Sequence, residues 1–340
     1  MIQGDTMTAD VTRRTAAKMA LAAAVTAQAS PTKAETIKKI LAVAIGDPNN
    51  RFDFRSPADS NLNSNSVRPY IRGVVSKLTA LGRQIGSYYM IEYREFEEGS
   101  INFSTPDLSL ILCLSTTVAK AANDLKISTI PVVAICSDPD HEKFTSNFFG
   151  VSAARWQKGK EYFNNFLDTV PSLQDMSKKI YVLHKKDYYP SEQALNKLKE
   201  NNPYGSKIEV VEISSYGEIE SKINGIAGPG GLLILPADWF FAKASKIFPV
   251  VQSKGLPDFW PVTDWVKPDG TGAVAGYGVS QLMSGEILAQ QIDEYWKTEK
   301  FPTGKKQWLD APDQISWMGS VSAAGACKVS LGFAKGLIHV

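Results

Sequence analysis

The sequence predicts an α/β protein with two domains, each built on a parallel sheet covered by helices. Two observations predict this class. Short apolar runs alternate with longer stretches of helical periodicity along the chain, which is typical of parallel sheets with helices on both faces. The chain also has 340 residues, more than one hydrophobic core usually contains, so two domains are expected.

The strands are predicted from apolar runs bounded by polar or turn-forming residues. In chain order they are residues 40–45, 88–93, 108–114, 131–136, 179–184, 208–213, 231–235, 259–263 and 273–277. Helices are predicted between them at 67–81, 117–126, 155–167, 192–201, 218–227, 241–254 and 281–298. In the last helix Met283, Ile287, Leu288, Ile292, Tyr295 and Trp296 form one apolar stripe, which at helical spacing indicates core packing.

Two segments interrupt this alternation. Asp47 to Ser66 is a stretch of about twenty residues rich in Asn, Asp, Ser and Pro after the first strand. A loop of that length is usually functional or disordered, and its place at the carboxyl end of a strand favours a role at a ligand cleft. Phe148 to Ser152 is a short apolar run with a glycine, and we interpret it as a crossing between the domains.

The first thirty residues are predicted to be an export signal, residues 1–29. Arg13, Arg14 and Lys18 precede the mild apolar run Met19 to Ala27, and Ala27-Gln28-Ala29 has the small-x-small pattern of a cleavage site. The paired arginines and the alanine-rich apolar core favour the twin-arginine route to the periplasm. The alternative is an amphipathic N-terminal helix. A membrane-spanning helix is not expected, because the apolar run is too short to cross a bilayer.

Composition excludes several classes of function. The signal would remove three of 37 basic and two of 35 acidic residues, leaving a charge near +1 and no footprint for nucleic acid or an anionic membrane. No later segment predicts an integral membrane span. Cys113 and Cys136 lie in apolar, strand-like runs, where buried free thiols are common, and an odd total of three cysteines argues against a disulfide framework.

Motifs for catalysis, metals and cofactors are absent from the sequence. The three histidines are His141, His184 and His339, and none is placed convincingly as a catalytic base. We expect His184 and His339 to be surface residues. The sequence has no Gly-x-Ser-x-Gly elbow, Gly-x-Gly-x-x-Gly loop or metal-ligand spacing. We therefore expect no enzyme activity, no metal and no cofactor.

Polar residues instead follow the strands directly. Ser115, Thr116 and Thr117 open a helix, where hydroxyls and free N–H groups form a site for a carboxylate. Asp138 and Asp238 also follow strands, and could bind an ammonium or a hydroxyl-rich ligand beside aromatic residues. Ordinary helix N-capping is the alternative for all of these positions.

Taken in order, several short motifs resemble the ABC-transporter substrate-binding family whose better-known members bind tryptophan or tyrosine. The resemblance runs from about Lys39 to Gly304 and rests on the order and spacing of the motifs together. The motifs are Leu81-Gly82, Ile91-Glu92-Tyr93-Arg94, Glu98-Gly99, Thr129-Ile130-Pro131-Val132-Val133, Ser137-Asp138-Pro139, Phe149-Gly150-Val151-Ser152, Leu233-Ile234-Leu235-Pro236-Ala237-Asp238, Gly255-Leu256-Pro257, Ala275-Gly276-Tyr277-Gly278 and Phe301-Pro302.

The resemblance implies a type-1 periplasmic-binding fold, with two doubly wound parallel-sheet domains, a hinge of about three crossings and an interdomain cleft. Domain one would comprise residues 38–150 plus 272–302, and domain two residues 151–271 plus 303–340. By analogy, Ser115, Thr116 and Thr117 would hold a carboxylate and Asp238 an ammonium. Trp239 and Tyr277 would stack on the ligand, with Asp138 and Asp264 as further polar contacts.

This sequence departs from the family in three segments. No glycine precedes Ser115, residues 141–147 replace the family's glycine-rich segment, and the loop at 47–66 is long. All three border the expected cleft, so the ligand can differ from those of relatives. The function expected is a periplasmic solute-binding protein that delivers a small molecule, such as an amino acid or aromatic compound, to an ABC permease and its ATPase. The alternative is a ligand sensor that feeds a signalling receptor.

Overall fold

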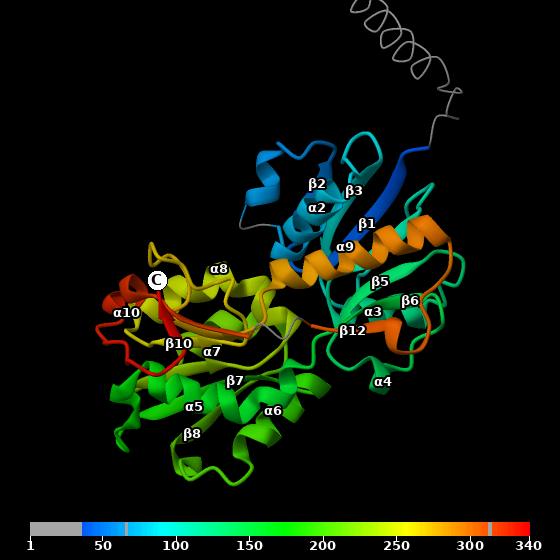
Figure 1. Cartoon of the computed structure of the whole chain (residues 1–340). Helices are drawn as coiled ribbons and strands as arrows, with labels where there is room; N and C mark the ends of the chain where they lie inside the picture. Colours follow the sequence, from blue (N-terminus) through cyan, green and yellow to red (C-terminus); the bar gives the residue numbers. More distant parts are fainter. Residues whose placement is uncertain (1–35, 65–66, 312–314) are drawn as a thin grey trace, which may run out of the picture. The chain divides into compact units, whose positions relative to one another are not determined.

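The strands of the chain form two sheets, each flanked by helices (Figure 1). In the computed structural model, which describes residues 36–64, 67–311 and 315–340, each sheet has seven strands. The predicted signal at residues 1–29 lies outside the described residues. Lys38–Val340 form one compact unit that contains both sheets.

The first sheet has β1, one of its two eight-residue strands, near the centre. Its order is β12 (Trp308–Asp310), β6 (Phe148–Ser152), β5 (Val132–Cys136), β4 (Leu110–Cys113), β1 (Lys38–Ile45), β3 (Tyr89–Phe96) and β2 (Arg51–Phe54). All neighbours are parallel except β2, which is antiparallel to β3. We call this sheet and its helices, α2 (Pro69–Ala80), α3 (Thr116–Asp124), α4 (Pro139–Glu142) and α9 (Gln281–Thr298), the first lobe.

The second sheet repeats this plan. Its order is β14 (Leu337–His339), β13 (Ser316–Gly319), β11 (Ala275–Gly278), β10 (Asp258–Trp260), β9 (Gly230–Ile234), β7 (Lys179–Lys185) and β8 (Ile208–Ile213). The β11 and β13 pair is antiparallel, and the other pairs are parallel. With α5 (Gly159–Thr169), α6 (Tyr189–Lys199), α7 (Ile219–Asn224), α8 (Asp238–Ser253) and α10 (Val321–Ala326) it forms the second lobe.

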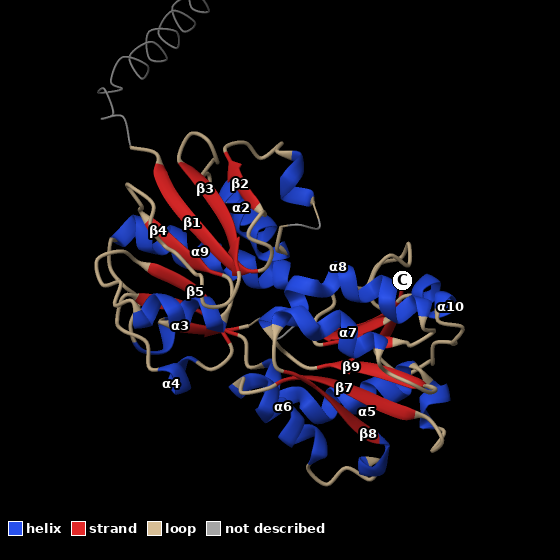
Figure 2. Ribbon diagram, turned by 180° about the vertical axis from the view of Figure 1, so that it is seen from behind, coloured by secondary structure: helices blue, strands red, loops and turns tan. Residues whose placement is uncertain are grey.

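Strand β1 shows why the first sheet is covered on both faces. Ile40, Ala42 and Ala44 pack in the core that contains α2 and α9, whereas Leu41, Val43 and Ile45 pack in the core that contains α3. Side chains alternate between faces along a strand, so a continuous apolar run requires cover on both sides. Figure 2 shows the arrangement from behind. The predicted fold class is confirmed.

Helices α2 and α9 approach each other unusually closely through two glycines. A methyl group on Gly73 would lie 2.0 Å from the carbonyl oxygen of Leu282, and one on Gly285 would lie 2.1 Å from that of Tyr70. Neither contact is sterically allowed, so only glycine permits this backbone spacing. The stripe predicted on α9 is largely core, because Leu288, Ile292 and Trp296 are buried against the first sheet.

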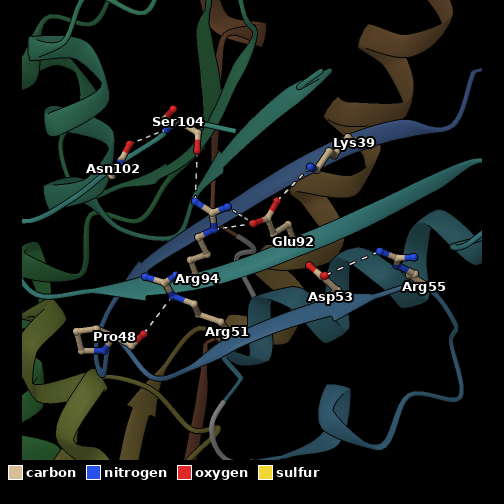
Figure 3. Close-up of polar contacts among 9 residues, drawn as sticks. All are labelled: Lys39, Pro48, Arg51, Asp53, Arg55, Glu92, Arg94, Asn102 and Ser104. Atoms are coloured by element: carbon tan, nitrogen blue, oxygen red, sulfur yellow. Dashed lines mark hydrogen bonds and ion pairs between the residues drawn. The ribbon is translucent and has the colours of Figure 1, made fainter. Parts of the chain in front are cut away.

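The outer edge of the first sheet is strongly charged (Figure 3). Alternation places Tyr93 of β3 in the core and Glu92 on the opposite face, where Glu92 forms ion pairs with Arg94 and with Lys39 of β1, the latter at 3.3 Å. On the edge strand β2, Asp53 pairs with Arg55 at 3.9 Å. Charged side chains on an edge strand oppose pairing with another chain.

Three predicted boundaries are corrected by the structure. Residues 148–152 are strand β6, and the crossing follows them; the segment is apolar because it is paired with β5 and β12. The predicted loop at 47–66 contains β2 and a 3₁₀ turn at Ser60–Asn63. Strand β11 lies in the second sheet, although residues 272–302 were predicted in domain one, and β12 lies in the first sheet, although residues 303–340 were predicted in domain two. Otherwise the division into ligand-binding domains stays a prediction.

His184 is a further correction. It lies on β7 between β8 and β9, and it is buried, whereas His339 is exposed as predicted. Cys113 and Cys136 are buried free thiols as predicted, and Cys327 is also free and buried. Among the described residues, no helix is long and apolar enough to cross a membrane.

Candidate functional site

A small cavity lies where the strand ends of the two lobes meet. Its volume is about 30 Å³, about the space that one water molecule takes in the liquid. The first lobe contributes Ala44, Ile45, Arg68, Tyr70, Leu114, Ser115, Thr116, Ile135 and Ser137 to its lining, and the second lobe contributes Tyr188, Pro236, Ala237, Asp238 and Phe241. Arg155 and Gln281 complete the lining from the segments by which the chain passes between the lobes. We call this the inner cavity.

A larger outer cavity of about 610 Å³ adjoins the inner one, since Arg68 and Phe241 line both. Asp47, Pro48 and Asn50 line it from the first lobe, and residues of α8 line it from the second. Its volume is in the range of small-molecule sites. The start of the long predicted loop therefore borders the cleft, as its position after a strand suggests.

Two of the three predicted hydroxyls line the inner cavity, and each of the three already has a hydrogen bond. Ser115 is the N-cap of α3, and its Oγ accepts from the N–H of Val118 at 3.2 Å. Thr116 Oγ1 accepts from the N–H of Ser137 at 2.8 Å. Thr117 donates to Asp238 Oδ2 at 2.6 Å. Ser115 and Thr116 line the inner cavity, and their role in binding a ligand stays a prediction.

Asp238 is a cavity residue and does not cap α8. The N-cap position is Ala237, which makes no side-chain capping bond, and Asp238 is the first helical residue. Its carboxylate acts on Tyr188, whose pKa is raised well above its usual range by burial and by this neighbouring charge. The N-capping alternative for Asp238 is therefore wrong, and its carboxylate faces Thr117 of the other lobe.

Besides Thr117, four predicted contacts do not line the inner cavity. Asp138 caps α4 by accepting from the N–H of His141 at 3.1 Å. Asp264 accepts from Ser280 Oγ at 2.8 Å and from the N–H of Gln281 at 2.7 Å, which holds the start of α9. Tyr277 donates to Glu161 Oε2 at 3.0 Å within the second lobe.

The fourth is Trp239, whose ring packs against the ammonium of Lys185 in a cation–π contact beside the cavity. Lys185 Nζ lies 3.9 Å from the centre of the Trp239 ring and 4.6 Å from that of Tyr188. The same ammonium forms a 2.7 Å ion pair with Glu98, which follows β3 in the first lobe. The lysine side chain is only 5% exposed. Lys185 thus links the lobes through the carboxylate of Glu98, and the two aromatic rings hold its ammonium within the second lobe.

Sequence reasoning missed the arginines and aromatic residues of the inner cavity. Arg68 precedes the proline that starts α2, and its Nη2 donates to the carbonyl of Ile45 at 2.7 Å. Tyr70, Tyr188 and Phe241 supply the aromatic lining predicted for Trp239 and Tyr277. The proline after Arg68 marks a helix start directly after the long loop, and this is the one signal that could have found Arg68.

Two polar side chains in this lining have buried atoms without a hydrogen-bond partner. Both amide atoms of Gln281, a residue with no exposed surface, lack one, and so does Arg155 Nε. Unpartnered buried groups are uncommon and cost free energy. Among the described residues, no group of acidic, histidine and cysteine side chains is arranged to hold a metal. The atoms without partners are two donors, Arg155 Nε and Gln281 Nε2, and one acceptor, Gln281 Oε1.

Comparison with solved structures identifies the fold class. The chain is similar to a conserved domain protein from Vibrio cholerae O1 biovar El Tor, with 16% identity, 87% of this chain and 96% of that chain covered, and a TM-score of 0.64. It is similar to an ABC domain from Streptococcus pneumoniae in complex with L-Trp, with 14% identity, 88% and 100% covered, and a TM-score of 0.60.

A third similar structure is the ligand-free, open form of a substrate-binding protein with adhesive properties from Clostridium difficile. It has 18% identity, 89% of this chain and 99% of that chain covered, and a TM-score of 0.51. No protein-family model and no curated protein matches the sequence. The similarities show the fold: the two lobes have the type-1 periplasmic-binding fold that the sequence resemblance implied.

Proposed function

We propose that this protein is the periplasmic solute-binding component of an ABC importer. It would capture a small molecule, such as an amino acid or an aromatic compound, in the inner cavity and deliver it to a permease and its ATPase. The observation that carries the proposal is the lining of this cavity by both lobes, with buried polar atoms of Gln281 and Arg155 that lack partners. A site of this kind is completed by a ligand.

An amino acid is the ligand class with the best support. Asp238 offers a carboxylate for an ammonium group, and Tyr70, Tyr188 and Phe241 offer apolar surface for a side chain. The pneumococcal structure of the same fold holds L-Trp. Export by the twin-arginine route would bring the folded protein to the periplasm. The unreactive surroundings of the cavity, with no histidine or cysteine in its lining, support binding without catalysis.

The volume of the inner cavity implies that binding requires movement. An amino acid does not fit in about 30 Å³, so the lobes would separate to admit it and close again around it. Such closure in hinged two-domain proteins is carried by a few residues at the crossings. Here those segments follow Ser152 of β6, Gly278 of β11 and Asp310 of β12.

The test begins with protein purified from its own host. Native mass spectrometry should show a bound small molecule, and calorimetry with that compound should give a one-to-one complex. Small-angle scattering should then give a different radius of gyration with and without the compound. A solute screen that includes the twenty L-amino acids, sugars and nucleosides provides a second route. If no compound copurifies and none in the screen binds, the proposed function is wrong.

A further inference from the structure

Arg155 is a buried cation without an ion-pair partner. Its side chain lies three residues after β6 and is nine-tenths buried. Among the described residues, no carboxylate lies within 4.0 Å of its guanidinium, and its one hydrogen bond runs from Nη2 to the hydroxyl of Tyr70 at 3.4 Å. A guanidinium is always charged and carries five N–H donors. Burying such a charge without a counterion is strongly unfavourable.

The nearby carboxylates are engaged elsewhere. Asp264 acts electrostatically on Arg155 but lies outside ion-pair distance, and its oxygens accept from Ser280 and Gln281. Asp238 accepts from Thr117. The other arginine of the cavity, Arg68, has Glu95 at 3.8 Å. Arg155 thus differs from Arg68 in two ways: no carboxylate lies within ion-pair distance of its charge, and its Nε–H group has no hydrogen-bond acceptor.

Gln281 also lines the inner cavity, and its side-chain amide also lacks hydrogen-bond partners. It follows β11 by three residues, as Arg155 follows β6. Both amide atoms lack partners, although the residue has no exposed surface. The nitrogen of its side-chain amide, Nε2, is a neutral donor that can complete the hydrogen bonding of an anion held by Arg155. Arg155 lies in the crossing that follows β6, and Gln281 begins α9 at the end of the crossing that follows β11.

From these observations we propose that Arg155 and Gln281 form an anion subsite that binds the carboxylate of the ligand. The inference rests on the proposed function and specifies its ligand class: a solute with a free carboxylate, whose ammonium, in an amino acid, would pair with Asp238. The sequence resemblance assigned the carboxylate to Ser115, Thr116 and Thr117. Of these, Thr117 donates its proton to Asp238, whereas Ser115 and Thr116 accept from backbone N–H groups, so any hydrogen bond that they donate to the carboxylate is neutral and that of Arg155 is charged. Because the subsite lies on the crossings, the charge of the ligand is bound at the pivot between the lobes.

The first test uses matched probes. Calorimetry is run with the twenty L-amino acids, with the α-carboxamides of those that bind, and with galactose, ribose and adenosine as neutral solutes. Wild-type protein should bind at least one amino acid, and its carboxamide should bind roughly 30-fold more weakly or not at all. Arg155→Met should weaken carboxylate binding by a similar factor, and Gln281→Met by a smaller one. Equal binding of acid and amide, or binding of neutral solutes only, would overturn the subsite and leave the proposed function intact.

The second test needs no ligand. Arg155→Met removes an uncompensated buried charge, so the unliganded variant should melt at the same temperature as wild type or higher. Arg83→Met is the matched control: Arg83 forms a 2.9 Å ion pair with Asp293 away from the cavity, so this variant should melt lower and bind normally. If no solute binds wild type, the proposed function fails. A lower melting temperature for Arg155→Met would then also make Arg155 a structural residue and overturn the subsite.

Discussion

Thr117 at the start of α3 donates a 2.6 Å hydrogen bond to Asp238 at the start of α8, and this bond joins the two lobes directly. The carboxylate that the sequence singled out for a ligand ammonium is thus held by the opposite lobe. Opening the lobes must break this bond, and a ligand ammonium can take the place of the threonine hydroxyl. The pair therefore couples lobe separation to exposure of the carboxylate.

Replacing Asp238 by alanine should weaken ligand binding by roughly 30-fold or more. Truncating one partner of a buried charge pair typically costs about 2 to 5 kcal/mol, and 1.4 kcal/mol is tenfold in affinity. The unliganded melting temperature should change little, since Ala237 and not Asp238 is the N-cap. Calorimetry with the copurified solute and thermal melting measure both quantities. Thr117→Val, which removes only the bond between lobes, is the control and should retain most of the affinity.

Replacing Glu98 by glutamine should favour separated lobes. Lys185 would lose its ion-pair partner in the closed arrangement, where its side chain is nearly buried, and would regain water in the open one. Hydrogen bonds to charged groups are worth about 1.5 to 3 kcal/mol, so small-angle scattering of the unliganded variant should give a larger radius of gyration. Glu200→Gln, which breaks the exposed Lys197 pair, should leave it unchanged. An unchanged radius for Glu98→Gln would show that Lys185 plays no part in closure.

Stability should fall at acid pH partly because of His184. Burial lowers the pKa of this histidine in the folded state, while the unfolded chain has a value of about 6.5. Its contribution is therefore fully present above about pH 6.5 and is lost as the pH falls below that value, because the unfolded state binds the proton more readily. Urea unfolding at pH 7.5 and 5.5 should show a smaller decrease for His184→Met than for wild type. His141→Gln, at an exposed position, should show the wild-type decrease.

The export signal can be tested on the full chain. Arg13→Lys together with Arg14→Lys should leave precursor in the cytoplasm, because the twin-arginine pathway recognises the guanidinium pair. Cell fractionation and immunoblotting measure where the protein accumulates. Normal periplasmic accumulation of the double variant would indicate the general secretory route instead.

The long elements could be predicted because their periodicity is set locally. Helix α9 has the predicted bounds, Gln281–Thr298, and β8 has the predicted bounds Ile208–Ile213. The strands β12, β13 and β14 have three or four residues each and are defined by the neighbours with which they pair. A three-residue strand has no periodicity of its own, so these elements could not be found from the sequence.

The site divides in the same way. Ser115 and Thr116 come two and three residues after β4, and Asp238 comes four residues after β9. The rule that ligands bind at the ends of such apolar strands placed them at the cavity. Tyr277 also lies at the end of a strand, but its side chain packs toward α5 and bonds Glu161. Arg155 and Gln281 follow their strands by three residues, and their meeting depends on how two distant crossings lie in space. The relative position of the two crossings is a property of the tertiary structure, so it could not be predicted from local sequence patterns.

The glycine pair between α2 and α9 bears on how the specificity of this fold can diverge. Tyr70 and Gln281, which line the inner cavity, lie three residues before Gly73 and four before Gly285. The separation of these two side chains is set by the contact of Gly285 with the backbone of Tyr70 and of Gly73 with the backbone of Leu282, not by side chains of the cavity lining. Cavity residues can be exchanged for a new ligand while both glycines stay fixed. A comparison of homologues limited to the lining residues would therefore miss Gly73 and Gly285, the two positions that fix the spacing of α2 and α9 beside the cavity.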